Sequence, residues 1–430
     1  MDEARSNEGD DRLLFNSIDF LIFFPIVFVS YWLLSRRAQN VLLLVSSYVF
    51  YAWWDWRFLG LIVFSSGLDY LVGRGMAVSE TLPRRRALLA VSLIANLGLL
   101  GFFKYCNFFI ASAADLLVAA GFEPNLRALE IVLPVGISFY TFQTLSYTID
   151  LYKREIEAET DLVAFFAFVA FFPQLVAGPI ERARNLLGQF SRDRHFDPSV
   201  AALACGQIVW GLFKKVVIAD TLAGFVDAAY NNPSAEGTEL ALATVFFAFQ
   251  IYCDFSGYSD IAIGCARLFG IDLMRNFAYP YFSRDVAEFW RRWHISLSTW
   301  FRDYVFIPLG GSRVGPWRLL RNALATFVLS GFWHGANLTF IAWGFLHAVY
   351  YVVSSRLVTK RAGTELPGGA GFLPSPRAAF QMAITFALVV FAWIFFRADS
   401  LAHAGSVIAA IATDTDWLGL PIYGKAKPKI

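Results

Sequence analysis

Long apolar stretches separated by short polar segments recur along most of the chain. Most of these stretches hold about 15–25 residues, the length that an α-helix needs to cross the hydrocarbon core of a bilayer. The pattern therefore predicts an all-α, polytopic membrane protein with about 11–12 transmembrane helices. The predicted spans are residues 18–34, 41–54, 58–73, 87–103, 105–121, 131–150, 162–180, 199–222, 240–266, 322–342, 343–357 and 378–396.

The composition agrees with a membrane protein and excludes an ordinary soluble domain. Of the 430 residues, 57% are hydrophobic and only 16% are charged, whereas soluble domains have about 25% charged residues. The four cysteines lie in apolar surroundings and form no C-x-x-C pair. We therefore expect them to be packing residues, with neither a disulfide framework nor a metal site. We also expect no nucleic-acid partner.

The sequence predicts three parts. Residues 1–17 form an acidic tail that we expect to be external, 18–398 form one membrane domain, and 399–430 form a C-terminal segment whose completeness the sequence leaves open. The start, Asp2–Asp11, is acidic and lacks the basic n-region of a secretory signal peptide. We therefore expect the first apolar run to remain in the bilayer as a helix.

The segments between the predicted spans alternate in charge. The acidic segments are 2–12, 153–161 and 227–239, and the basic ones are 36–37, 74–86, 181–195, 267–321 and 356–361. Because basic loops stay cytoplasmic, the alternation predicts cytoplasmic basic segments and external acidic ones. The longest, 267–321, is expected to be a re-entrant or amphipathic segment at the cytoplasmic face. Three lysines at 425–429 do not fit an even number of spans.

A histidine lies inside one of the predicted spans. The run Ala323–Trp343 holds no Lys, Arg, Asp or Glu, and His334 is its only side chain that titrates near neutral pH. Ionisable residues at membrane depth are costly and normally face a protein-lined or watery cavity, so His334 is a candidate for function. Helical spacing would place Ser330 and Asn337 on its face, with room beside Gly331. The alternative is a structural histidine bonded to Ser330 or Asn337, and the residues alone leave both open.

Segment 280–313 has the pattern of an amphipathic helix at the cytoplasmic face. Its apolar residues recur at three- and four-residue steps, with arginines between them. They are Phe289, Trp290, Trp293, Leu297, Trp300 and Phe301. Beside them, His294 would share one narrow face with Arg291 and Ser298, and this face could line an entrance for an anionic ligand such as a coenzyme A phosphate. The pattern alone favours the alternative, an interfacial anchor with tryptophans at headgroup depth.

Three more polar residues of interest lie inside predicted spans. Asp254 and Tyr258 belong to a polar cluster, and a carboxylate at membrane depth must be protonated, paired or exposed to water. Pairing of the acid with arginines of 267–321 is favoured over a direct role in chemistry. His347 is interpreted either as a core histidine or as a neighbour of His334.

In order along the chain, these segments resemble the membrane-bound O-acyltransferase family, in the bacterial branch that O-acetylates polysaccharides such as alginate. The resembling stretches are 133–143 (LPVGISFYTFQ), 172–180 (FPQLVAGPI), 251–260 (IYCDFSGYSD), 289–298 (FWRRWHISLS), 300–304 (WFRDY), 307–311 (IPLGG) and 330–337 (SGFWHGAN). They cover about 15–400 in register, and together they are highly specific. Proteins of D-alanyl transfer to teichoic acid share the two histidines, but the motifs look closer to the acetylation branch.

The resemblance implies a membrane fold with a central tunnel and two functional histidines. His334 matches the membrane histidine of the family, and His294 matches its histidine on the cytoplasmic side, which reverses the preference for an anchor. The other candidates around the site and tunnel are Trp333, Ser330, Asn337, Arg291, Ser298, Asp254 and Tyr258. His334 would act as a general base or carry the acyl group itself, and the sequence does not separate these two routes.

The resemblance also implies an acetyl thioester, acetyl-CoA, as the donor, and no tightly bound cofactor. The acetyl group would cross the bacterial inner membrane and modify an extracytoplasmic polysaccharide, alginate-like or another cell-surface polymer. Because the predicted external segments are short, we expect two partners besides membrane lipids: an extracytoplasmic acetyltransferase of serine-hydrolase type and the polysaccharide export machinery. The alternatives left open are D-alanyl, lipid or protein O-acyl transfer, and a non-catalytic conduit.

Overall fold

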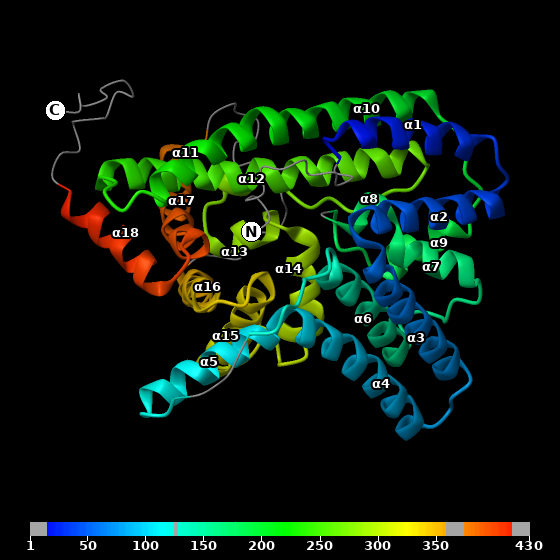
Figure 1. Ribbon diagram of the computed structural model, residues 1–430, viewed down its shortest axis with the longest axis horizontal. Helices are drawn as coiled ribbons and strands as arrows, with labels where there is room; N and C mark the ends of the chain where they lie inside the picture. The colour runs from blue at the N-terminus through cyan, green and yellow to red at the C-terminus, as the bar shows by residue number, and fades with distance from the viewer. Residues whose placement is uncertain (1–14, 124–127, 177, 358–373, 415–430) are drawn as a thin grey trace. The chain divides into compact units, whose positions relative to one another are not determined.

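The computed structural model describes residues 15–123, 128–176, 178–357 and 374–414. This part of the chain is built from helices and contains no strand (Figure 1). The predicted all-α class is therefore confirmed. Most of the expected acidic tail lies outside the described residues, as do the C-terminal lysines and most of the basic segment 356–361.

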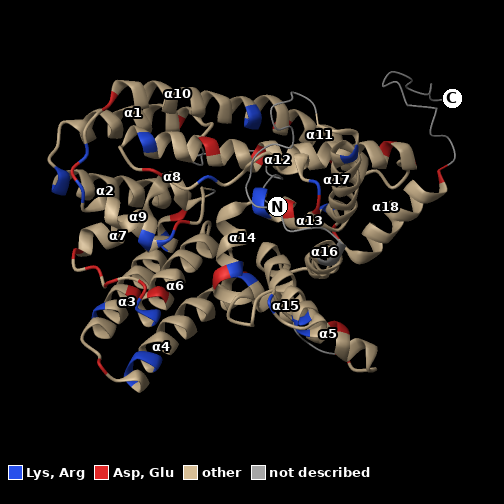
Figure 2. Cartoon of the chain, turned by 180° about the vertical axis from the view of Figure 1, so that it is seen from behind, with Lys and Arg blue, Asp and Glu red and all other residues tan. Residues whose placement is uncertain are grey.

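Five helices in the described ranges are long and apolar enough to cross a membrane. They are Leu82–Ala119, Pro198–Tyr230, Gly237–Leu268, Leu338–Ser355 and Pro376–Arg397. Charged side chains are sparse along the long helices (Figure 2). These helices confirm the predicted polytopic membrane class. Most of the other predicted spans correspond to helices of 15–20 residues.

The chain divides into two compact units. Unit 1 comprises Met1–Leu212 and Gly257–Asn276, and unit 2 comprises Phe213–Ser256 and Phe277–Ile430. Helix α12 (Gly237–Leu268) contributes residues to both. The other helices of unit 1 are α1 (Ile18–Trp32), α2 (Arg36–Asp55), α3 (Leu59–Ala77), α4 (Leu82–Leu100), α5 (Cys106–Ala119), α6 (Ile137–Lys153), α7 (Leu162–Ala170), α8 (Phe172–Leu175), α9 (Ala183–Phe190) and α10 (Pro198–Leu212).

The predicted spans 87–103 and 105–121 are not separate helices but form one helix of 38 residues, Leu82–Ala119. A π-helical turn at Gly101–Tyr105 joins α4 to α5, and the helix bends there (Figure 1). The prediction placed a break at Lys104. Lysine is a good helix former, so a single lysine inside an apolar run does not by itself end a helix.

Helix α5 is not a crossing of its own. The Asn107 side chain donates to Leu129 O and accepts from Leu129 N, both at 2.9 Å, so the chain after α5 returns to the start of that helix. Lys104 Nζ donates to Ser138 Oγ (3.2 Å) at the beginning of α6. Helix α5 therefore adds no change of side between α4 and α6.

Segments 74–86 and 153–161 lie at the same end of unit 1, which contradicts the predicted alternation of sides. Arg85 donates from Nη1 to Met76 O (2.7 Å) and from Nη2 to Tyr152 O (3.3 Å). Residues of both segments also line one cavity of about 730 Å³. The prediction for 153–161 was wrong because it counted α5 as a crossing.

The predicted span 162–180 is also not a single helix. It contains α7 with nine residues and α8 with four, about 14 and 6 Å of helix, whereas the hydrocarbon core is about 30 Å thick. Phe165 and Phe168 of α7 are fully buried. The ion pair Arg184–Glu155 (3.9 Å) joins the segment after α8 to the segment before α7, so both segments lie at the same end of unit 1. The segment therefore packs inside unit 1 without crossing.

Unit 2 contains the elements that carry the two histidines. Besides its part of α12, these are α11 (Asp220–Tyr230), α13 (Val286–Arg292), α14 (Ile295–Phe301), α15 (Pro316–His334), α16 (Leu338–Leu357), α17 (Pro376–Arg397) and α18 (Leu401–Thr413). Its core is strongly aromatic. Trp343 and Trp393 are both fully buried and stack with ring centroids 5.9 Å apart.

Helices α15 and α16 form a tight hairpin. A Cβ atom on Gly331 would lie 2.1 Å from Phe340 O, and one on Gly344 would lie 2.3 Å from Phe327 O. Only glycine permits two helices to approach this closely. The space beside Gly331, which the sequence suggested was open to a ligand, is filled by the backbone of α16.

Helix α15 ends at His334, although the predicted span continued to residue 342. Gly335 is its C-cap in an extended conformation (φ −162°, ψ 149°), and α16 begins at Leu338. The sequence held a signal for this, because glycine often follows the last turn of a helix and Asn337 is a favoured N-cap residue. The predicted polar face that joined Asn337 to His334 therefore does not exist.

Candidate active site

Two histidines from different elements of unit 2 lie next to each other. His334 is the last residue of α15, and His294 lies between α13 and α14. Their ring centroids are 6.5 Å apart. His294 is only 1% exposed, whereas His334 is half-buried. The structure thus brings together the two histidines singled out in the sequence, and it adds Trp333, whose ring lies 6.2 Å from that of His294.

His334 is surrounded by aromatic rings from three helices. Its ring centroid lies 4.9 Å from Trp333 of α15, 5.4 Å from Trp343 of α16 and 5.3 Å from Phe396 of α17. These rings fix the imidazole and limit the directions from which a reactant can approach. Sequence reasoning missed Trp343 and Phe396, because nothing in an apolar, aromatic-rich span shows which of its faces will meet a distant residue.

His294 interrupts the amphipathic helix predicted for 280–313. Its backbone is left-handed (φ 41°, ψ 56°), which separates α13 from α14. Histidine is among the few non-glycine residues enriched in this conformation. Arg291 and Ser298 therefore do not share a helix face with His294, and the prediction of one narrow polar face was wrong.

The His294 ring is held in a nearly closed environment. Its Nδ1 lies 3.4 Å from Ser296 Oγ, and its ring centroid lies 4.6 Å from Phe255 and 6.4 Å from Phe277. Burial, and next the charge that His334 would carry, lower the pKa of His294 well below its ordinary value. His294 is therefore a neutral imidazole at pH 7.

The aromatic residues around His294 are buried, contrary to the anchor alternative. Phe289 and Trp293 are 1% and 3% exposed. The arginines between them are not all at the surface either, since Arg292 is fully buried and bonds Glu288 at 2.9 Å. Burial alone would raise the pKa of Glu288, but hydrogen bonds from Arg284 and Arg292 hold it below its ordinary value. This buried ion pair anchors α13 directly before His294.

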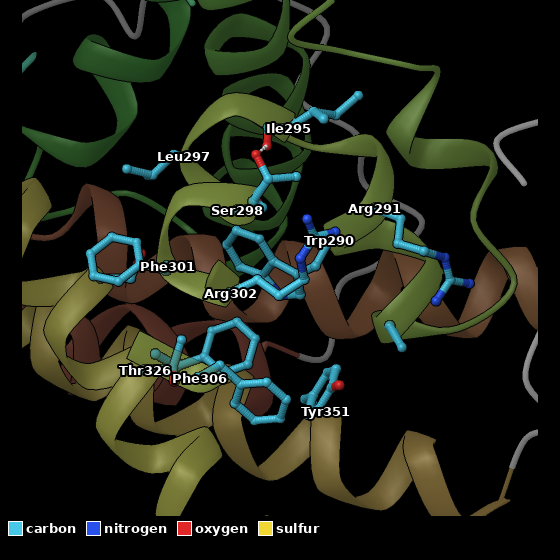
Figure 3. Close-up of a pocket in the computed structure, with 14 residues that line it drawn as sticks. Trp290, Arg291, Ile295, Leu297, Ser298, Phe301, Arg302, Phe306, Thr326 and Tyr351 are labelled. Carbon is cyan, nitrogen blue, oxygen red and sulfur yellow. Dashed lines mark hydrogen bonds between the residues drawn. The ribbon is translucent and has the colours of Figure 1, made fainter. Parts of the chain in front are cut away.

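A cavity of about 470 Å³ in unit 2 (Figure 3) is lined by Ile295, the residue after His294, and by Ser330, four residues before His334. Its walls are mainly aromatic and aliphatic, with a few hydroxyls and two arginines. The polar lining residues include Arg291, Ser298, Thr299, Arg302, Thr326, Ser330 and Tyr351. One cavity thus brings together three predicted site residues, Arg291, Ser298 and Ser330. His294 itself is not a lining residue, but its neighbour Ile295 is.

Asn337 has a structural role that the sequence prediction did not assign. Its Oδ1 accepts a hydrogen bond from Thr339 N (3.0 Å), which caps the start of α16. Its Nδ2 donates to Asp399 O (2.8 Å), before α18. The residue therefore fixes the connection that follows His334 and does not orient the imidazole by helical spacing.

Asp254 and Tyr258 lie one turn apart on α12, but they are assigned to different units of the chain. Asp254 belongs to unit 2 and pairs with Lys215 at 2.8 Å, so the predicted partner, an arginine of 267–321, was wrong. Tyr258 belongs to unit 1, where its ring packs 6.1 Å from Phe15. Neither residue is among those that line the cavity.

His347 is a core histidine that shares a neighbour with His334. It is fully buried, and its ring lies 4.9 Å from Trp343, which also contacts His334. Across the described ranges, no group of three or more His, Cys, Asp or Glu side chains is placed to hold a metal ion.

Comparison with known proteins places this site in a family. A model of the family described as MBOAT, membrane-bound O-acyltransferase, matches residues 153–362, which include both histidines and the whole cavity lining. A probable alginate O-acetylase of Pseudomonas putida is 40% identical over 408 residues, 94% of this chain and 81% of that protein. The chain belongs to the membrane-bound O-acyltransferase family. It is therefore an acyltransferase and a multi-pass membrane protein.

Two further relatives of this membrane-bound O-acyltransferase are named for transfer to other polymers, and one of them is named for a different transferred group. A peptidoglycan O-acetyltransferase of Helicobacter pylori is 37% identical, with 92% of this chain and 79% of that protein covered. A teichoic acid D-alanyltransferase of Streptococcus thermophilus is 29% identical, with 65% and 72% covered. The relatives named for acetyl transfer are thus more similar to this chain than the one named for D-alanyl transfer.

Proposed function

We propose that this acyltransferase moves an acetyl group from cytoplasmic acetyl-CoA across the bacterial inner membrane, for O-acetylation of a cell-surface polysaccharide. The observation that carries the proposal is the pair of His334 and His294, from segments that also line the cavity of about 470 Å³. The printed names of two relatives, alginate O-acetylase and peptidoglycan O-acetyltransferase, support acetyl as the transferred group. The polymer itself stays unassigned.

The cavity suits the pantetheine arm of the donor. Ligand pockets commonly measure about 300–1,000 Å³ and combine apolar walls with a few polar groups, and this cavity has both properties. Arg291 and Arg302 are exposed at its lining, and arginine is well suited to the phosphates of coenzyme A. Ser330 lines the cavity one helical turn before His334. An arm in the cavity would therefore bring its thioester toward the end of α15.

His334 is the proposed catalytic residue. In the reaction the C–S bond of the thioester breaks, a C–O bond forms to the acceptor, and the hydroxyl proton ends on the sulfur of coenzyme A. As a general base, His334 would take this proton and return it to the leaving thiolate. As an acyl carrier, its ring nitrogen would first attack the carbonyl carbon. The neutral His294 would relay a proton or guide the arm.

Substitution of His334 by alanine tests the assignment. We expect His334→Ala to reduce polysaccharide acetylation to background while the protein is still made and inserted. The readout is acetyl content of the extracted polymer from cells that lack the chromosomal copy. His195→Ala is the matched control, since His195 is an exposed loop residue and should leave acetylation unchanged. Wild-type acetylation by His334→Ala would remove His334 from the chemistry.

We propose that a partner chooses the sugar. Selection of one hydroxyl on a polymer needs several convergent polar groups, and the predicted external segment 227–239 is short. An extracytoplasmic acetyltransferase of serine-hydrolase type, working with the polysaccharide export machinery, would take the acetyl group from this protein. Reconstituted alone with acetyl-CoA and soluble polymer, the protein should transfer little. Efficient transfer without any partner would instead indicate a one-component enzyme.

A further inference from the structure

His347 is a buried titratable residue that the proposed chemistry does not use. It lies on α16, is fully buried, and accepts at Nδ1 a hydrogen bond from Trp290 Nε1 (3.2 Å). The two rings are nearly perpendicular, with centroids 5.0 Å apart. Because Nδ1 accepts, the ring proton of the neutral tautomer is on Nε2. The histidine therefore serves the indole of Trp290 as its acceptor.

Trp290 faces the cavity as well as His347. It is one of the lining residues (Figure 3), and its ring packs against Phe327, another lining residue, at 5.2 Å. An indole N–H without an acceptor in a buried site is penalised. The bond to His347 therefore holds the indole in one orientation, and this orientation sets where one wall of the cavity stands.

Aromatic rings packed around His347 hold its imidazole in one orientation. Its ring is packed by Trp343 at 4.9 Å, Tyr350 at 5.8 Å and Phe289 at 6.2 Å. His347 does not itself line the cavity, so it cannot touch a ligand there. Its influence on a ligand has to pass through Trp290.

We propose that Trp290, positioned by His347, limits the length of the acyl group that can pass from the cavity to His334. This inference rests on the proposed use of the cavity by an acyl thioester. Phe327 and Ser330 both line the cavity and lie about one turn apart on α15, the helix that ends at His334. An acyl group that moves along this side of the cavity to His334 therefore passes the wall made by Trp290 and Phe327. An apolar wall of this kind discriminates by about 10–200-fold per methylene.

The test is a comparison of acyl chain lengths in inside-out membrane vesicles, which contain the native partners. Acetyl-CoA, propionyl-CoA and butyryl-CoA carry a radioactive acyl group, and label in the polysaccharide gives kcat/KM for each. We expect the preference of the wild type for acetyl over butyryl to fall at least about 10-fold in Trp290→Ala and in His347→Leu. His347→Asn should keep the preference, because its amide oxygen can replace Nδ1 as the acceptor.

Two further variants keep the test decisive. Tyr350→Phe changes a ring that packs on His347 but does not line the cavity, and it should leave both rate and preference unchanged. If His347→Leu does not accumulate, Trp290→Phe removes the donor while it keeps a ring, and should also lower the preference. Active Trp290→Ala and His347→Leu or Trp290→Phe proteins with the wild-type preference would overturn the inference. A wild type that transfers no acetyl group would instead refute the proposed function.

Discussion

His294 combines a left-handed backbone with an almost completely buried imidazole. For a residue with a Cβ atom, the left-handed conformation costs about 1–2 kcal/mol. Such a conformation persists only where its surroundings determine it, and residues of this kind gather at functional sites. Here Arg292, two residues before His294, donates from Nη1 to Ala278 O, and its own carbonyl accepts from Ala278 N. The two bonds hold the chain on one side of His294.

Acid should destabilise the protein through His294. Its pKa is far below the ordinary value of 6.5 because of burial and then His334, so near this pH the unfolded chain binds a proton that the folded protein excludes. The contribution of His294 to stability is full above about pH 6.5 and is lost as the pH falls below it, by up to about 1.4 kcal/mol per unit. His294→Asn, which tolerates the left-handed backbone, should flatten this dependence.

Thermal unfolding of the purified protein at pH 7.5 and 5.5 measures the effect. Burial raises the pKa of Glu181 to about 7, and this group acts in the opposite sense, since its contribution decreases as the pH rises. The difference between wild type and His294→Asn cancels that background. Identical pH dependence in the two proteins would contradict a neutral, buried His294.

Single residues show where sequence reasoning stops. His334 and His294 could be found from their type and from family motifs, and the structure places them together. Asn337 was given a place on the face of His334 by helical spacing, yet it caps the next helix because Gly335 ends α15 first. Phe396, which packs on His334, had no signal at all. Contacts between distant helices depend on packing that periodicity does not encode.

At the scale of elements, the α15–α16 hairpin should be sensitive to a single methyl group. Gly331→Ala would place Cβ 2.1 Å from Phe340 O, so the helices must separate, at a cost of about 1–3 kcal/mol. Gly224→Ala in α11 is the control, because nothing lies within 4 Å of its added Cβ, and it should be neutral or stabilise by about 0.5–1 kcal/mol. Thermal unfolding compares the two variants, and equal stability would contradict the close approach.

Helix positions followed well from the apolar runs, but the number of crossings did not. A run of apolar residues shows that a helix is present, whereas a crossing requires that the helix runs from one face to the other. The bend at Gly101–Tyr105 and the short helices α7 and α8 reduce the number of crossings. A hydropathy pattern predicts neither the bend nor the break between α7 and α8. Lys104 misled the prediction because its ammonium is accommodated by Ser138 in a neighbouring helix.

For the molecule as a whole, these corrections change the expected sidedness of one segment. Residues 153–161 should be on the same side as 74–86, since both segments line one cavity. In a cysteine-free variant, Glu80→Cys and Glu157→Cys should therefore react alike with an impermeant thiol reagent in intact cells. Both positions are exposed. The basic character of 74–86 predicts that neither is labelled from outside.

Ser234→Cys supplies the opposite control for this experiment. It is an exposed position in the acidic segment 227–239, which is still expected to be external, and it should be labelled in intact cells. Labelling of Glu157→Cys but not of Glu80→Cys would contradict the arrangement at this end of unit 1. Labelling of both, without Ser234→Cys, would invert the orientation derived from the charges.

Helix α5 has no buried residue, and Phe109, Leu116 and Val118 are exposed. The bend at Gly101–Tyr105 turns α5 away from the direction of α4 (Figure 1). From there we expect α5 to lie among the lipid headgroups, where helices respond to lipid packing and to curvature. Growth conditions that remodel the membrane should then alter the degree of polymer acetylation while the amount of enzyme stays the same.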